Sequence, residues 1–159
     1  MKNEHAEESF LDIQREKQLE NACRAFILHE RKILLCKQKM RNFWTLPGGS
    51  VKEGETLVEC ISREIIEEIG IKLQIEQMLF IRELINSSRH RIEFYFSTKR
   101  QDNSQFYEEI SPCNEIVEAR FFTLEELRFI RLKPVCLPDL IREAFNQTSV
   151  FPRYLGNVK

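Results

Sequence analysis

The sequence predicts an α+β fold in which a mixed β-sheet is flanked by helices, and three observations lead to it. Short segments with alternating apolar and polar residues are typical of strands. Two segments begin with a Thr-x-x-Glu signature that is typical of helix starts. The two kinds of element do not alternate as regular β-α-β units. The chain has 159 residues, which fits one domain with its own core, so we expect a single domain over residues 21–159 after a charge-rich helical extension over residues 1–20.

Strands are expected where apolar residues recur with a period of two, or gather in short runs between turn residues. The clearest alternation places Ile92, Phe94 and Phe96 between polar or charged neighbours. The expected strands cover residues 22–28, 32–37, 72–84, 91–98 and 115–122. The tail over residues 149–159 shows no pattern that assigns it an element.

The best-defined helix should cover residues 57–69. Thr56 and Glu59 have the spacing of a capping box at its start, and Gly70 is placed to end it as a C-terminal cap. The same capping signature predicts a second helix over residues 123–130. A last helix should begin at Pro138, because proline is tolerated in a first turn.

Composition excludes several classes of partner. A net charge of -1 and a pI near 6.3 give no basic surface for a nucleic acid polymer. No apolar run approaches the ~20 residues of a membrane helix, and no signal-peptide core is visible. Five cysteines, an odd number without a Cys-x-x-Cys pair, favour neither a disulfide framework nor a zinc site. We therefore expect a cytoplasmic protein that binds neither membranes nor nucleic acid polymers, with cysteines as small core residues.

The helix over residues 57–69 has an unusual charge distribution. At about 100° per residue, its apolar side chains form one stripe, made of Leu57, Val58, Ile61, Ile65 and Ile69. Three glutamates share an arc of about 100° beside that stripe, namely Glu64, Glu67 and Glu68. Carboxylates that converge near an apolar edge repel one another unless a cation joins them. Their oxygens suit Mg²⁺, while a solvated acidic face is the alternative.

The residues around these glutamates extend the pattern. Gly49 is followed after five positions by Glu55, and after seven more by Arg63-Glu64-Ile65-x-Glu67-Glu68-x-Gly70-Ile71. This spacing resembles the signature of the Nudix hydrolase family at every fixed position. The lead-in "WTLPGG" and the junction of "VEARFF" with "TLEEL" are similar to the family's as well, so the resemblance covers about residues 21–145.

The resemblance implies a fold, a reaction and a cofactor. The fold is an α/β/α sandwich. The reaction is hydrolysis of a nucleoside diphosphate linked to another group X. The cofactor is a divalent metal, usually Mg²⁺, with Mn²⁺ as a substitute. Because many relatives are dimers, a homodimer is one open assembly state.

The resemblance also implies roles for individual residues. Metal ligands would be Gly49, Glu64, Glu67 and Glu68. Arg63 would orient a carboxylate through its bidentate fork, and Glu55 and Gly70 would support the loop and helix. Glu67, Glu68, Arg63 and Glu115 form the expected catalytic set. Glu115 is the general base suggested by the family's strand-helix junction, and its rivals are Glu108, Glu109 and Glu118.

Residues that hold the substrate are less well defined by the sequence. Arg24 and Arg41 are candidates for phosphate binding, with Lys37 and Lys39 as further cations; a solvated strand face is the alternative. Trp44 is a candidate for stacking on a base, with Phe43, Phe106 and Tyr107 as others; core packing is the alternative. A turn near Arg89, His90 and Arg91 reads as solubilising.

Substrate marks known in the family are missing here. Asn86, Ser87 and Ser88 occupy the region where some subclasses carry a proline or a tyrosine. This absence favours a nucleoside triphosphate, including oxidised ones. ADP-ribose or a nucleotide sugar stays as an alternative substrate, and a non-catalytic nucleotide-sensing module stays as an alternative function.

Overall fold

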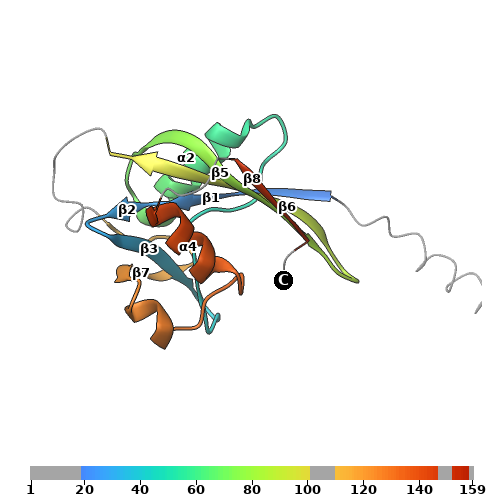
Figure 1. Cartoon of the computed structure of the whole chain (residues 1–159). Helices are drawn as coiled ribbons and strands as arrows, with labels where there is room; N and C mark the ends of the chain where they lie inside the picture. Colours follow the sequence, from blue (N-terminus) through green and yellow to red (C-terminus); the bar gives the residue numbers. More distant parts are fainter. Residues whose placement is uncertain (1–18, 101–109, 147–151, 158–159) are drawn as a thin grey trace, which may run out of the picture.

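The computed structural model describes residues 19–100, 110–146 and 152–157 (Figure 1). The expected helical extension falls on residues 1–18, which lie outside the described residues, and on two residues that begin the first strand. That strand, β1, starts at Leu19, two residues before the predicted domain boundary.

The first sheet is mixed, as the sequence predicts. Its strand order is β1-β6-β5-β8; β1 pairs with β6 and β5 with β8 in parallel, whereas β5 and β6 are antiparallel. The strands are β1 (Leu19–Phe26), β5 (Gln74–Ile85), β6 (His90–Lys99) and β8 (Arg153–Asn157). Strand β8 lies in the tail to which the sequence assigned no element.

The second sheet is antiparallel and is built around β3, which pairs with β2, β4 and β7. Its strands are β2 (Leu28–His29), β3 (Lys32–Gln38), β4 (Trp44–Thr45) and β7 (Ile116–Thr123). The first sheet's β1 leads through Ile27 directly into β2, so the two sheets follow each other closely along the chain.

Helices lie on opposite sides of the sheets (Figure 1). Helix α2 (Leu57–Ile69) contributes to one hydrophobic cluster, which also contains Ala25 of β1. Helix α4 (Leu137–Asn146) contributes to a second cluster, which contains the next residue of β1, Phe26. Consecutive residues of β1 therefore face opposite helices, as expected for a strand buried on both sides. This layering confirms the predicted α/β/α arrangement.

Helix α2 begins and ends where the sequence predicts. Thr56 and Glu59 form the reciprocal capping box, and Gly70 ends the helix in the left-handed conformation at φ 77°. The predicted apolar stripe is wrong at Val58, which is 51% exposed. Val58 lies in the first turn, where Leu57 makes the contact with the core.

The prediction of a helix over residues 123–130 is also wrong. Thr123 and Glu126 make the capping contacts, but the segment forms only the 3-10 turn η1 (Glu126–Phe129). The chain is then extended, because the residues on either side of Leu132 pair with Trp44: the Trp44 amide donates to the Arg131 carbonyl at 2.8 Å, and the Lys133 amide donates to the Trp44 carbonyl at 3.0 Å. Tertiary pairing therefore ends the helix after one turn.

The cysteines form no disulfide. Cys23, Cys36 and Cys60 are buried core residues, as predicted, whereas Cys113 and Cys136 are partly exposed. Among the described helices, none has the length and apolar character needed to cross a membrane.

Candidate active site

The loop that precedes α2 passes between β1 and the helix at two consecutive glycines, Gly48 and Gly49. The Gly49 carbonyl accepts a hydrogen bond from the Cys23 amide at 2.9 Å, which fixes the loop along β1. Gly48 has φ 133°, and a Cβ there would lie 2.1 Å from the Cys23 carbonyl oxygen. A Cβ on Gly49 would lie 2.5 Å from the carboxyl atoms of Glu64. The backbone therefore requires glycine at position 48, whereas at position 49 the missing Cβ leaves room for the Glu64 carboxylate.

Arg63 joins three of the carboxylates. Its Nε and Nη2 donate to the two oxygens of Glu55 at 2.7 and 2.9 Å, and its Nη1 donates to Glu64 at 2.6 Å and to Glu67 at 3.0 Å. The hydrogen bond from Arg63, together with one from the Lys52 amide, lowers the pKa of Glu55 to about 2, and Glu55 in turn raises the pKa of Arg63. One guanidinium therefore ties the loop to two glutamates of the helix.

Glu68 lies deeper than its neighbours. One carboxylate oxygen accepts a hydrogen bond from the Gly48 amide at 2.8 Å. Burial raises the pKa of Glu68 to about 7, against the opposing effects of that hydrogen bond and of Arg24. A cation placed beside this carboxylate would favour its charged form.

The three glutamates of α2 line a cavity of about 240 Å³, which we call the acidic cavity. Glu64, Glu67 and Glu68 form one wall, and Glu115, from the loop before β7, contributes to the lining with its neighbour Asn114. The Asn114 side chain donates to the Glu67 carbonyl at 2.8 Å, which fixes this loop to the end of α2. The structure therefore brings Glu115 to the three helix glutamates, with Gly49 at the same cavity.

The other candidates for the general base lie elsewhere. Glu118 is an exposed residue on β7 and does not line the acidic cavity. Glu108 and Glu109 lie outside the described residues.

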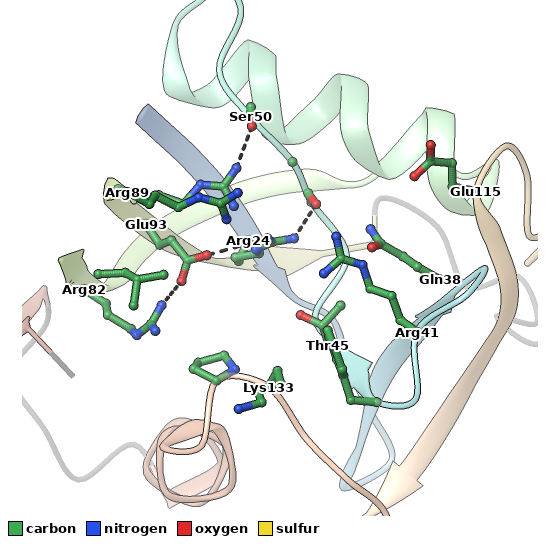
Figure 2. A pocket seen from close by; sticks show the side chains of 16 residues that line it. Arg24, Gln38, Arg41, Thr45, Ser50, Arg82, Arg89, Glu93, Glu115 and Lys133 are labelled. Atoms are coloured by element: carbon green, nitrogen blue, oxygen red, sulfur yellow. Dashed lines mark hydrogen bonds and ion pairs between the residues drawn. The ribbon is translucent and has the colours of Figure 1, made fainter. Parts of the chain in front are cut away.

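A second cavity of about 500 Å³, the basic cleft, continues from the first. The two share Gln38, Gly48, Gly49 and Glu115 in their linings. Figure 2 shows Arg24, Arg82 and Arg89 at one side of this cleft and Glu115 at the other. Further cations in its lining are Arg41, Arg91 and Lys133.

The sequence-predicted substrate residues divide between this cleft and the core. Arg24 and Arg41 line the cleft, and Arg41 lies 5.5 Å from the ring of Phe43, which lines it as well. Trp44 does not: it is 9% exposed and packs edge-on against Phe122, with ring centroids 4.7 Å apart. This is the core role that the sequence left as the alternative.

The remaining candidates do not line the cleft among the described residues. The Lys37 ammonium lies over the Trp44 ring at 6.0 Å, and Lys39 is exposed. Phe106 and Tyr107 lie outside the described residues.

With this geometry established, comparison with known proteins identifies the family. The family model described as NUDIX domain matches residues 19–143. The chain belongs to the Nudix family. The 8-oxo-dGTP diphosphatase of Buchnera aphidicola is 31% identical over 75 residues, which cover 46% of this chain and 60% of that protein. The 8-oxo-dGDP phosphatase NUDT18 of Homo sapiens is 36% identical over 61 residues, 36% of this chain and 19% of that protein.

A solved structure shares the fold over nearly the whole chain. The crystal structure of a UDP-X diphosphatase superposes with a TM-score of 0.72 at 23% identity, covering 97% of this chain and 75% of that one. The matched regions make up 60% and 19% of the lengths of these two curated relatives. The likeness to the solved structure therefore establishes the Nudix fold of this chain.

The Nudix helix offers the chemistry of a divalent cation site. Carboxylate oxygens beside a main-chain carbonyl are the donors that Mg²⁺ prefers, and the absence of a Cβ at Gly49 keeps space open at Glu64. Within the described ranges, no three acidic, histidine or cysteine side chains already converge on one point. The reason is that Glu64 and Glu67 are turned to Arg63, and Glu68 to the Gly48 amide. The donor set fits the cation, and these carboxylates would exchange partners to bind it.

Besides Lys133, the charged residues of the basic cleft that the sequence did not assign to it are Arg82, Glu93, Arg89 and Arg91; the last two were interpreted as part of a solubilising turn. Register explains how they meet. Arg82 is paired with Glu93 across β5 and β6, and Arg91 lies two residues from Glu93 on the same side of β6. The available signal was the alternation of Arg91, Glu93 and Tyr95 along the predicted strand over residues 91–98.

Proposed function

We propose that this Nudix protein hydrolyses a diphosphate bond in a nucleoside diphosphate linked to another group X. One observation carries the proposal: an acidic cavity suited to a divalent cation opens into a basic cleft, with Gly48, Gly49 and Glu115 common to both. A diphosphate chain would need both parts: a divalent cation to neutralise part of the charge on its phosphate oxygens, and cationic side chains for the remaining charge.

Glu64, Glu67, Glu68 and the Gly49 main chain would hold the cation, with Mg²⁺ as the expected ion and Mn²⁺ as its substitute. When bound, such an ion neutralises phosphate charge and lowers the pKa of a coordinated water. In this structure Arg63 holds Glu64 and Glu67 beside the cavity through hydrogen bonds of 2.6 and 3.0 Å, which contacts with the cation would replace. Arg24 and Arg41 bind phosphate oxygens in the cleft.

Glu115 accepts the proton of the attacking water. The carboxylate lines both cavities, opposite the helix glutamates, and a general base must reach the nucleophile in the bound state. Glu118 points to a different part of the surface, so we assign it no role in the reaction.

A nucleoside triphosphate, including an oxidised one, is the substrate we propose. The similarity to an 8-oxo-dGTP diphosphatase supports this choice, and the cations of the basic cleft provide charge for a third phosphate. ADP-ribose and nucleotide sugars serve as comparison substrates.

The test is a panel of nucleoside triphosphates, ADP-ribose and nucleotide sugars, assayed with Mg²⁺ or Mn²⁺ for released phosphate or pyrophosphate. Glu67→Gln and Glu68→Gln should each reduce metal-dependent turnover to below a few per cent. Glu76→Gln, an exposed glutamate on β5 outside both cavities, is the matched control and should behave as wild type. Mg²⁺ should also raise the thermal midpoint, because an ion that binds only the folded state stabilises it.

Two results would reject the proposal. One is full turnover in both glutamine variants. The other is tight nucleotide binding without cleavage of any compound in the panel, which would make this chain a nucleotide-sensing module.

A further inference from the structure

The basic cleft carries more positive charge than its own carboxylates balance. The described residues that line it include six cationic side chains and two carboxylates, Glu93 and Glu115. Glu115 lies at the end shared with the acidic cavity, so Glu93 is the carboxylate among the arginines. Apolar lining residues are few: Phe43, Leu84 and Pro134.

Glu93 is already fully engaged. It accepts hydrogen bonds from Arg82 and from the Tyr95 hydroxyl, the latter at 2.7 Å, and its other oxygen lies 3.6 Å from Arg24. The side chains of Glu93 and Arg82 are 7% and 5% exposed. One buried carboxylate of the cleft lining thus lies against two of its arginines.

Arg89 and Arg91 add to this excess from the hairpin that joins β5 to β6. Both lie near the same oxygen of Glu20, at 3.7 and 3.2 Å, and Glu20 is not part of the cleft lining. Arg91 also donates to the hydroxyl of Ser50, another lining residue, at 2.6 Å, which fixes its guanidinium at the cleft.

Repulsion within this group supports the same conclusion. Burial, followed by the charge of Arg24, lowers the pKa of Arg91, against the opposing effect of Glu93. Like charges held close together in a cavity are unfavourable unless a ligand of opposite charge compensates them. Clustered carboxylates on α2 favour a bound cation, and clustered arginines in the cleft favour a bound anion for the same reason.

We propose that the basic cleft selects substrates that carry a further anionic group, phosphoryl or carboxylate, beyond the diphosphate held at the acidic cavity. The inference rests on the proposed function and narrows its substrate class. A terminal phosphate, a sugar carboxylate or a phosphorylated ribose supplies the charge, whereas a neutral sugar leaves the arginines uncompensated. Because the lining is poor in apolar side chains, charge is the main property by which the cleft discriminates.

The first experiment measures anion binding without turnover. Inorganic tripolyphosphate is titrated calorimetrically in EDTA into wild type, Arg89→Gln and Arg91→Gln. Each variant loses one charge-assisted contact, so affinity should fall about tenfold and depend less steeply on salt. Arg128→Gln removes an exposed arginine of η1 outside the cleft and should bind as wild type. Equal affinity in all four proteins would overturn the inference.

The second experiment measures kcat/KM with Mg²⁺ for two substrate pairs. UDP-glucuronate and UDP-glucose differ in a charge on X, and 2′-phospho-ADP-ribose and ADP-ribose differ in a charge on the nucleoside. We expect the charged member to be preferred by about tenfold or more in one pair, which identifies the half of the substrate in the cleft. Arg89→Gln and Arg91→Gln should move that ratio toward one.

The outcomes separate the two proposals. Turnover with equal kcat/KM within both pairs overturns the inference and leaves the hydrolase function intact. Binding of tripolyphosphate that depends on Arg89 and Arg91, without hydrolysis of any diphosphate, overturns the proposed function and leaves the anion site intact.

Discussion

Gly49→Ala should separate the function of the site from the stability of the fold. The added Cβ would lie 2.5 Å from Glu64 Cδ and from both its carboxylate oxygens, so this carboxylate has to move by about 1 Å to reach an ordinary contact distance. The atoms in the way belong to the end of a flexible side chain, and Gly49 is not among the glycines with positive φ. The displacement therefore falls on Glu64, not on the backbone.

The expected cost is large in turnover and small in stability. A misplacement of about 1 Å in a catalytic group costs roughly 10²-fold in rate, and the contact of Glu64 with Arg63 at 2.6 Å is lost with it. Unfolding free energy should change by less than about 1 kcal/mol, because alanine at a compatible φ also lowers the entropy of the unfolded chain. Urea denaturation, Mn²⁺ titration and turnover with Mg²⁺ measure the three quantities on one preparation.

Two other glycines are the controls. Gly48→Ala places a Cβ 2.1 Å from the Cys23 carbonyl oxygen at φ 133°, where backbone cannot yield, so it should destabilise the fold by at least about 2 kcal/mol. Gly54 has φ 75° and open space around it, and asparagine tolerates that conformation, so Gly54→Asn should keep both stability and activity. If Gly49→Ala keeps turnover within about threefold of wild type, the argument that Glu64 needs this space is wrong.

Three further predictions follow from individual contacts. Glu115→Gln should lower turnover by about 10²–10⁴-fold, the usual contribution of a general base, while Glu118→Gln on the exposed side of β7 keeps the wild-type rate; equal rates in the two variants would remove Glu115 from the reaction. Thr56→Ala removes the hydroxyl that accepts from the Glu59 amide at 3.2 Å and should cost about 1 kcal/mol in urea denaturation. Burial alone would raise the pKa of Glu93. The charge of Arg24, the hydrogen bond from Tyr95 and the charges of Arg82 and Arg91 outweigh burial and hold this pKa below the ordinary 4.5. The stabilisation by Glu93 is therefore present above pH 4.5 and is lost as pH falls through the folded-state pKa. Glu93→Gln, although less stable at neutral pH, should therefore show a flatter decline in unfolding free energy than wild type as pH falls below 4.5.

The sequence predicts which residues of the acidic half lie together, because that half is local. Gly49, Glu55 and Arg63 lie within fifteen residues of one another, and a loop followed by one helix is enough to bring them together. The helical period places Glu64, Glu67 and Glu68 on one arc without knowledge of any other element. The same local signals give the bounds of α2, its capping box and its C-terminal cap, and the predicted α+β class and Nudix family are confirmed.

The basic half depends on strand pairing, which no short pattern contains. Arg91, Glu93 and Tyr95 alternate as a solvated face would, but Tyr95 packs in the hydrophobic cluster that includes α4 and Phe96 packs in the one that includes α2, so both faces of this part of β6 are covered. Tyr95 is fully buried as a result. Strand β8 was missed for a related reason: it is short, contains Gly156, and is defined by its parallel pairing with β5 rather than by alternation.

Gly48, one of the residues common to both cavities, also couples the positions of side chains in the two. The Gly48 amide donates to Glu68, while the carbonyl of the same residue accepts from Arg24, so one glycine carries a ligand-holding contact on one side and an anion-binding contact on the other. A substitution at Arg24 should therefore disturb the position of Glu68 as well, and its effects on KM and kcat would be inseparable. Kinetic dissection of this protein is better begun from Arg89, a cleft residue whose guanidinium pairs with Glu20.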